Sequence, residues 1–216
     1  MNTDELIERL SADRPPSALL GPTTTISLAV AASSVVVLGL AASWVGTPSE
    51  LLETIAAGDH HFFLNIAFLL CVLGVAYLFV RDLSVPGRRL RMPIAFALAP
   101  LVMMVVLALH ELGSVSLAQW PHHVPHESWL TCIWQVGVLA IPAFAILSLA
   151  VRRLAPTDLS RAGLYIGLLS GGLGAMGYLL CTGDDNFVLS STAYVVVIVS
   201  MAFVGALVGP RLLRWS

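Results

Sequence analysis

Long runs of apolar residues dominate the pattern along the chain, and short polar stretches separate them. Each run is close to the ~20 residues that a membrane-spanning helix needs. None shows the regular alternation of polar and apolar residues that is typical of strands in a membrane barrel. The pattern therefore predicts six transmembrane helices, over residues 24–45, 62–80, 93–112, 130–151, 162–181 and 188–209.

The composition points the same way. Of the 216 residues, 57% are hydrophobic and only 11% are charged, whereas a soluble domain has about 25% charged residues. This excludes an ordinary soluble domain and predicts an all-α membrane protein. No charged residue falls near the middle of a predicted span, which argues against a proton-coupled transporter.

Arginine residues determine the predicted orientation. The chain has eleven arginines and no lysine, and every arginine lies before the first span, after the sixth, or in the second or fourth connection. Cytoplasmic loops of membrane proteins carry an excess of positive charge. Both termini and these two loops are therefore expected to be cytoplasmic.

The opposite face carries the candidate chemistry. Cys132 lies at the start of the fourth span and Cys181 at the end of the fifth, so antiparallel packing would bring them to a similar depth. The pair could form a disulfide, bind a soft metal such as copper or zinc, or only pack. Cys71, inside the second span, is expected to be a packing residue.

Histidines and acids on the same face could complete a metal site. The segment "HHVPHE" supplies three imidazoles, and a pair of carboxylates follows the second cysteine. His60, His61, His110 and Glu111 could add further ligands, although ordinary interfacial roles remain an alternative for every histidine. The candidate metal ligands are Cys132, Cys181, His122, His123, His126, Asp184 and Asp185.

The first 22 residues form a separate segment ahead of the membrane domain, residues 23–216. An amphipathic helix is expected here, because Leu6, Ile7 and Leu10 share one face while Asp4, Glu5 and other charged residues fall mostly on the other. So short a helix is marginal alone. It is either a frayed tail or a docking peptide that folds in a groove of a basic partner.

The fifth span carries small residues at every fourth position: Gly163, Gly167, Gly171 and Ala175. Such stripes allow helix backbones to approach each other closely in membranes. The spacing therefore predicts tight packing of this span against a neighbour.

Four segments together resemble the NrsF family of membrane anti-sigma factors. They are "TDELIERLSAD", "SWLTC", "LAVRRLAPTDLSRAGLYIGLLSGGLGAMGYLLCTGDDNF" and "GALVGPRLLRW". The resemblance extends over essentially the whole chain, and six spans with a cytoplasmic N-terminus match the family.

The resemblance implies a regulator of the bacterial inner membrane rather than an enzyme. Such proteins hold an extracytoplasmic-function sigma factor, without binding nucleic acid directly, and release it under heavy-metal or oxidative stress. Asp4, Glu5, Leu6 and Ile7 match the family's N-terminal motif, and Cys132 and Cys181 match its two periplasmic cysteines. A membrane thiol oxidoreductase or metal-handling protein, and a structural subunit whose cysteines only pack, are the alternatives.

Overall fold

Six α-helices make up the fold, and the part of the chain that the structure describes contains no strand. This structure is a computed structural model, and it describes residues 21–46, 55–56, 58–83, 95–113, 126–154, 158–182 and 187–212. The helices are α2 (Pro22–Trp44), α4 (His60–Leu83), α5 (Ala95–Gly113), α7 (His126–Arg152), α8 (Leu159–Thr182) and α9 (Phe187–Leu212). The predicted spans are thus confirmed as helices, with ends that differ by a few residues.

Five of these helices are long and apolar enough to cross a membrane, whereas the apolar part of α5, Ala95–Glu111, is shorter. With its 19 residues, α5 measures about 28 Å at a rise of 1.5 Å per residue. This is close to the ~30 Å thickness of a bilayer's hydrocarbon core. The set of helices fits a multi-pass membrane protein.

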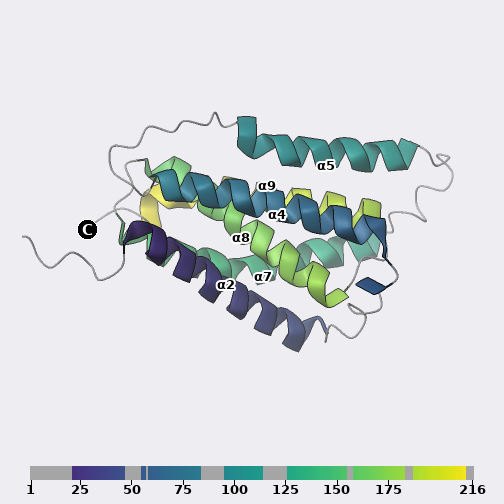
Figure 1. Ribbon diagram of the computed structural model, residues 1–216, viewed down its shortest axis with the longest axis horizontal. Coiled ribbons are helices and arrows are strands. Elements are labelled where there is room, and N and C mark those ends of the chain that lie inside the picture. The colour runs from purple at the N-terminus through teal and green to yellow at the C-terminus, as the bar shows by residue number, and fades with distance from the viewer. Residues whose placement is uncertain are drawn as a thin grey trace, which may run out of the picture.

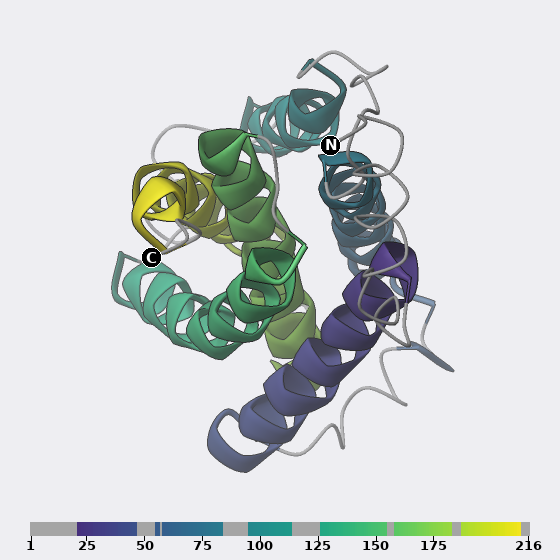
Figure 2. The ribbon, with the colours of Figure 1, turned by 90° about the vertical axis from the view of Figure 1, so that its left-hand side faces the viewer.

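Helix α8 lies at the centre of the bundle. It contacts α9, α7, α4 and α2, which surround it in the end-on view of Figure 2, while α5 lies at the edge against α4 and α9. In Figure 1, α8 runs diagonally between its neighbours. Fifteen of its 24 residues are buried, so this helix forms the core that the other helices cover.

Glycines on α8 explain how closely α9 approaches it. A Cβ atom built on Gly163 would overlap the carbonyl oxygen of Gly205, and one built on Gly167 would overlap that of Met201. One turn further, a Cβ on Gly171 would lie 2.9 Å from the Ile198 Cα atom. The predicted tight packing along this stripe is confirmed, and its partner is α9.

Three further glycines open the other sides of α8. Gly174 packs on the backbone of α7, and Gly177 and Gly172 pack on side chains of α2 and α4, respectively. Because none of these positions carries a side chain, all four neighbours approach the same central helix.

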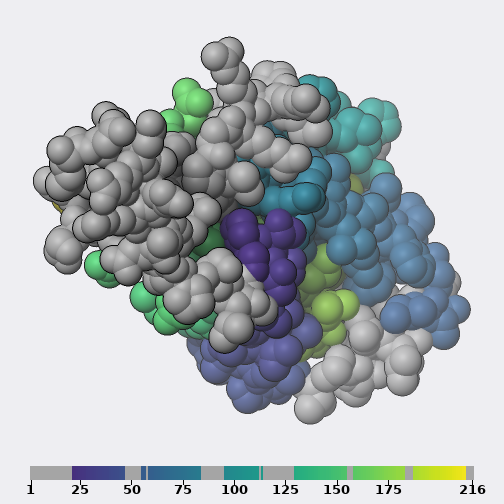
Figure 3. Space-filling view, turned by 60° about the vertical axis from the view of Figure 1, so that its left-hand side comes forward, coloured from purple at the N-terminus to yellow at the C-terminus, as the bar shows by residue number. Residues whose placement is uncertain are grey.

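The exterior of the bundle is apolar. Val35, Trp134 and Phe203 are each more than 60% exposed, as expected for side chains that contact lipid. Cys71 is also exposed on α4, so the expectation that it packs in the interior was wrong; its position in the helix turns it away from α8. Figure 3 shows α8 at the surface between α2 and α4, which contact each other only slightly.

We expect Gly167→Ala to lower the stability of the bundle by about 1–3 kcal/mol, the usual cost of overpacking. The new methyl group would meet backbone atoms of α9, 2.7 Å from the Ala202 Cα atom, and backbone cannot move aside as a flexible side chain can. Thermal unfolding of the detergent-solubilised protein measures the change.

Gly39→Ala is the matched control, because a Cβ atom at Gly39 meets nothing within 4 Å. Alanine is the better helix former, so this variant should unfold at the same temperature as the wild type or higher. Equal destabilisation by both substitutions would contradict the close-approach explanation.

Candidate functional site

The two candidate cysteines lie at one end of the bundle, which we call the cysteine end. Cys132 lies in the second turn of α7 and is 2% exposed, and Cys181 lies in the last turn of α8 and is half-buried. The cysteine end consists of the first turns of α4, α7 and α9 together with the last turns of α2 and α8 (Figure 1).

The packing of α7 on α8 sets the relative height of the two cysteines. A Cβ atom on Gly174 would lie 2.8 Å from the Val136 carbonyl oxygen and 2.9 Å from the Ala140 amide nitrogen, so the helices meet there. Cys181 lies two turns beyond Gly174, and Cys132 lies one turn before Val136. Because positions four or seven apart share a helix face, both cysteines lie on the facing sides of α7 and α8.

The cysteines form neither a disulfide nor a group with other metal-binding residues in the described part of the chain. All three cysteines are described, and none is joined to another. The described residues also contain no cluster of three or more His, Cys, Asp or Glu side chains. What this arrangement offers is one buried and one half-buried thiol at the packed ends of two helices.

Several predicted site residues lie outside the described residues. These are Asp4, Glu5, Leu6, Ile7, Leu10, His122, His123, Asp184 and Asp185; His126 begins α7, but its side chain is likewise outside. Of the remaining histidines, His60 and His61 lie together at the start of α4, with ring centroids 3.9 Å apart. His110 lies near the end of α5.

Aromatic and polar contacts join the cysteine end to the first turns of α9. The rings of His61 and Phe187 are 4.8 Å apart, which joins α4 to α9. The indole N–H of Trp129 donates to the Thr192 hydroxyl at 3.3 Å, which joins α7 to α9. Because of the contact between Trp129 and Thr192, a shift of α7 at this end would also displace the first turns of α9.

Helix α8 is also in contact with the first turns of α9, through an edge-on pair of aromatic rings. The ring centroids of Tyr178 and Tyr194 are 6.4 Å apart, at an interplanar angle of 74°. Tyr178 lies one turn before Cys181, so α9 contacts both cysteine-bearing helices. This shared position of α9 could not be predicted from the sequence, because no local pattern links residues from separate spans.

The opposite end of the bundle carries the positive charge, and we call it the arginine end. It holds the arginines that close α4, α7 and α9 and the one that begins α8. In Figure 1 these helix ends lie on the same side. The described arginines at this end are Arg81, Arg152, Arg153, Arg161 and Arg211.

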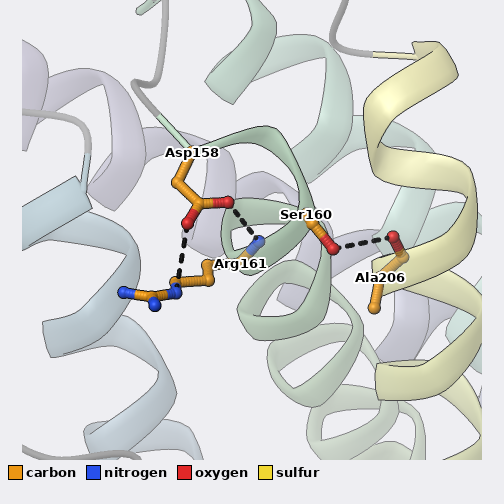
Figure 4. Close-up of polar contacts among 4 residues, drawn as sticks. All are labelled: Asp158, Ser160, Arg161 and Ala206. Carbon is orange, nitrogen blue, oxygen red and sulfur yellow. Dashed lines mark hydrogen bonds and ion pairs between the residues drawn. The ribbon is translucent and has the colours of Figure 1, made fainter.

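Asp158 fixes the start of α8 at the arginine end. Its side chain accepts the amide N–H of Arg161 at 3.1 Å, which is the usual geometry of an N-terminal helix cap, and it also pairs with the Arg161 guanidinium at 3.1 Å (Figure 4). Ser160 donates to the Ala206 carbonyl at 3.2 Å. The Asp158 contacts thus hold the first turn of α8, and the Ser160 bond joins that turn to α9. An aspartate just before a helical stretch is a sequence signal that could have identified the cap.

Comparison with known proteins gives a consistent family. The model of the NrsF family, described as negative regulator of sigma F, matches residues 10–215. The anti-sigma-F factor NrsF of Caulobacter vibrioides is 29% identical over 217 residues, covering 100% of both chains. A probable anti-sigma-F factor NrsF of Azospira oryzae is 28% identical over 155 residues, covering 71% of this chain and 72% of its own. No solved structure matches the chain.

The difference in burial between the cysteines predicts the order in which they react. In single-cysteine variants, a water-soluble maleimide should label half-buried Cys181 at least several-fold faster than Cys132, because Cys132 is 2% exposed. Mass shift on a gel measures the rates, and labelling in detergent and sodium dodecyl sulfate gives the fully accessible reference.

Cys71 provides the matched control, since it is exposed but lies in the middle of α4. A membrane-permeable apolar maleimide should label it in membranes, whereas the water-soluble reagent should not. Faster labelling of Cys132 than of Cys181 by the water-soluble reagent would contradict the described burial.

Proposed function

Because the chain belongs to the NrsF family of negative regulators of sigma F, we propose that it is an anti-sigma factor that holds an extracytoplasmic-function sigma factor at the bacterial inner membrane. The observation that carries this proposal is the match to an anti-sigma-F factor along the full length of both chains. The role is regulatory and not enzymatic.

The distribution of charge supports an inner-membrane orientation with the arginine end in the cytoplasm. All described arginines belong to that end, and positively charged residues favour the cytoplasmic side. Both termini then lie in the cytoplasm, where the sigma factor is. The cysteine end lies in the periplasm, an oxidising compartment in which a thiol can report on oxidants and metals.

The N-terminal segment is the proposed docking element. Leu6, Ile7 and Leu10 provide an apolar helical face, and Asp4 and Glu5 make the segment acidic. An amphipathic helix of this kind binds in an apolar groove of its partner, and its acidity suits a basic partner better than an anionic membrane surface.

Release is proposed to begin at Cys132 and Cys181. Oxidation of the pair or binding of a soft metal such as copper or zinc would change the packing of α7 and α8 at the periplasmic end. The central position of α8 supports this route, because the same helix carries Cys181 at one end and the Asp158 cap at the other. A 100-fold release of the sigma factor needs about 2.7 kcal/mol of preference for the released state.

The docking element is tested by Leu6→Ala/Ile7→Ala. Loss of the two apolar side chains should weaken capture of the sigma factor by about 30-fold or more, which corresponds to at least ~2 kcal/mol of lost apolar burial. Co-purification of a sigma factor with the full-length protein, followed by a binding titration, measures the effect.

Glu8→Ala/Arg9→Ala is the control, because it changes the polar face of the same segment with no change in net charge. This variant should retain most of the binding. Full capture by the Leu6/Ile7 variant would show that the segment is not the docking element.

The sensing role is tested by Cys132→Ser/Cys181→Ser. In cells carrying a sigma-dependent reporter, this variant should repress the reporter as the wild type does but should no longer respond to copper, zinc or peroxide. Cys71→Ser should respond normally, since Cys71 lies on the lipid-facing side of α4. A normal response of the double variant would mean that the cysteine pair only packs.

A further inference from the structure

A surface groove follows α7 beside α9, away from the two cysteines. Two adjoining cavities of about 300 and 290 Å³ follow the two helices, and Ile141 borders both. The second cavity, which we call the α7–α9 groove, is lined by Ile141, Phe144, Ala145, Ser148, Leu149, Arg152 and Leu212.

The groove faces outward from the bundle. Ile141 is 59% exposed and Leu149 is 62% exposed, so exposed side chains border the groove. Ser148 is buried and Phe144 packs against the core, so the groove reaches inward from this exposed border. Small side chains at Ala145 and Ser148 leave the space between the larger residues. In a chain that spans the membrane, the molecules that surround such walls are lipids.

Positive charge gathers at one end of the groove. Arg152 lines it, and Arg153 and Arg211 are exposed at the same end of the bundle. Arg161, at the same end of the bundle, pairs with Asp158 on α8. The groove thus combines an apolar lining with one arginine, the last of its α7 residues.

The length of the groove corresponds to one leaflet of a bilayer. Ile141 and Arg152 are eleven residues apart on α7, which is about 16 Å along a helix. Half of the hydrocarbon core is about 15 Å. With Arg152 at headgroup height, the apolar walls would extend to the bilayer midplane.

We propose that the α7–α9 groove binds one anionic phospholipid of the cytoplasmic leaflet. The headgroup phosphate pairs with Arg152, and an acyl chain lies along Phe144, Ala145 and Leu149. The proposal uses the orientation proposed above but does not depend on sigma-factor binding.

Charge also distinguishes this occupant from a second copy of the chain. Two copies in one membrane have the same orientation, so a helix of the second copy in the groove would bring its own arginine end beside Arg152. Like charges at that distance oppose association, whereas a phosphate group complements the site.

The test titrates the purified protein in detergent with phosphatidylglycerol or phosphatidylcholine of identical acyl chains and counts bound lipids by native mass spectrometry. The wild type should bind its first phosphatidylglycerol about fivefold more tightly than phosphatidylcholine, as expected for ~1 kcal/mol per arginine near anionic lipid. Arg152→Gln should abolish this preference, and Arg152→Lys should retain most of it.

Arg153→Gln is the matched control, because it removes the same charge from the neighbouring residue, which does not line the groove. Ala145→Leu, which fills the groove, should weaken the binding of both lipids. Equal binding of the two lipids to the wild type, equal effects of Arg152→Gln and Arg153→Gln, or a dimer that binds no lipid would each overturn the proposal. Failure of this test would leave capture of the sigma factor unaffected, so the two proposals can fail separately.

Discussion

The close approach of α8 to its neighbours is the interaction on which the rest of the structure depends. In a bilayer, lipid tails are as apolar as leucine, so helices associate through packing and not through removal of apolar surface from water. Glycine supplies that packing here: Gly163 and Gly167 bring α8 against α9, and Gly174 brings it against α7. The glycine-rich helix α8 forms the core, which explains its high burial. Of the residues in its apolar stretch, 72% are buried, whereas the share is 28–56% in the other four helices that are long enough to span a membrane.

Three buried serines of this bundle satisfy their hydroxyl groups within their own helices. Ser33, Ser170 and Ser191 are fully buried, yet each hydroxyl donates to a carbonyl of its own helix, at 2.7, 3.0 and 3.3 Å. With no water in the hydrocarbon region, such internal bonds avoid the cost of an unsatisfied group. These three serines therefore need no polar partner on a neighbouring helix, and close packing can proceed around them. The hydrogen bonds between helices described above, of Trp129 with Thr192 and of Ser160 with Ala206, lie near the helix ends.

The sequence predicted the fold well and the candidate site only in outline. Length and hydropathy located all six helices, because a spanning helix must be continuous and apolar, and the spacing of Gly163 and Gly167 predicted close packing. The partner of that stripe and the central place of α8 were not predictable, since Gly172, Gly174 and Gly177 face different neighbours and follow no single stripe. Cys71 was misassigned for a related reason: in an apolar helix, composition does not distinguish the lipid-facing side from the buried one.

Central packing also bears on how a signal could cross the membrane. Cys132 and Cys181 lie on the facing sides of α7 and α8, and α9 contacts both helices near the cysteine end. At the other end, Ser160 joins α8 to α9. Since a helix is stiff along its axis, a tilt imposed at the cysteines would move the α8 start against α9. Between these two contacts, Gly163, Gly167 and Gly205 let the backbones of α8 and α9 meet directly, so a displacement at one end would reach the other through a closely packed seam.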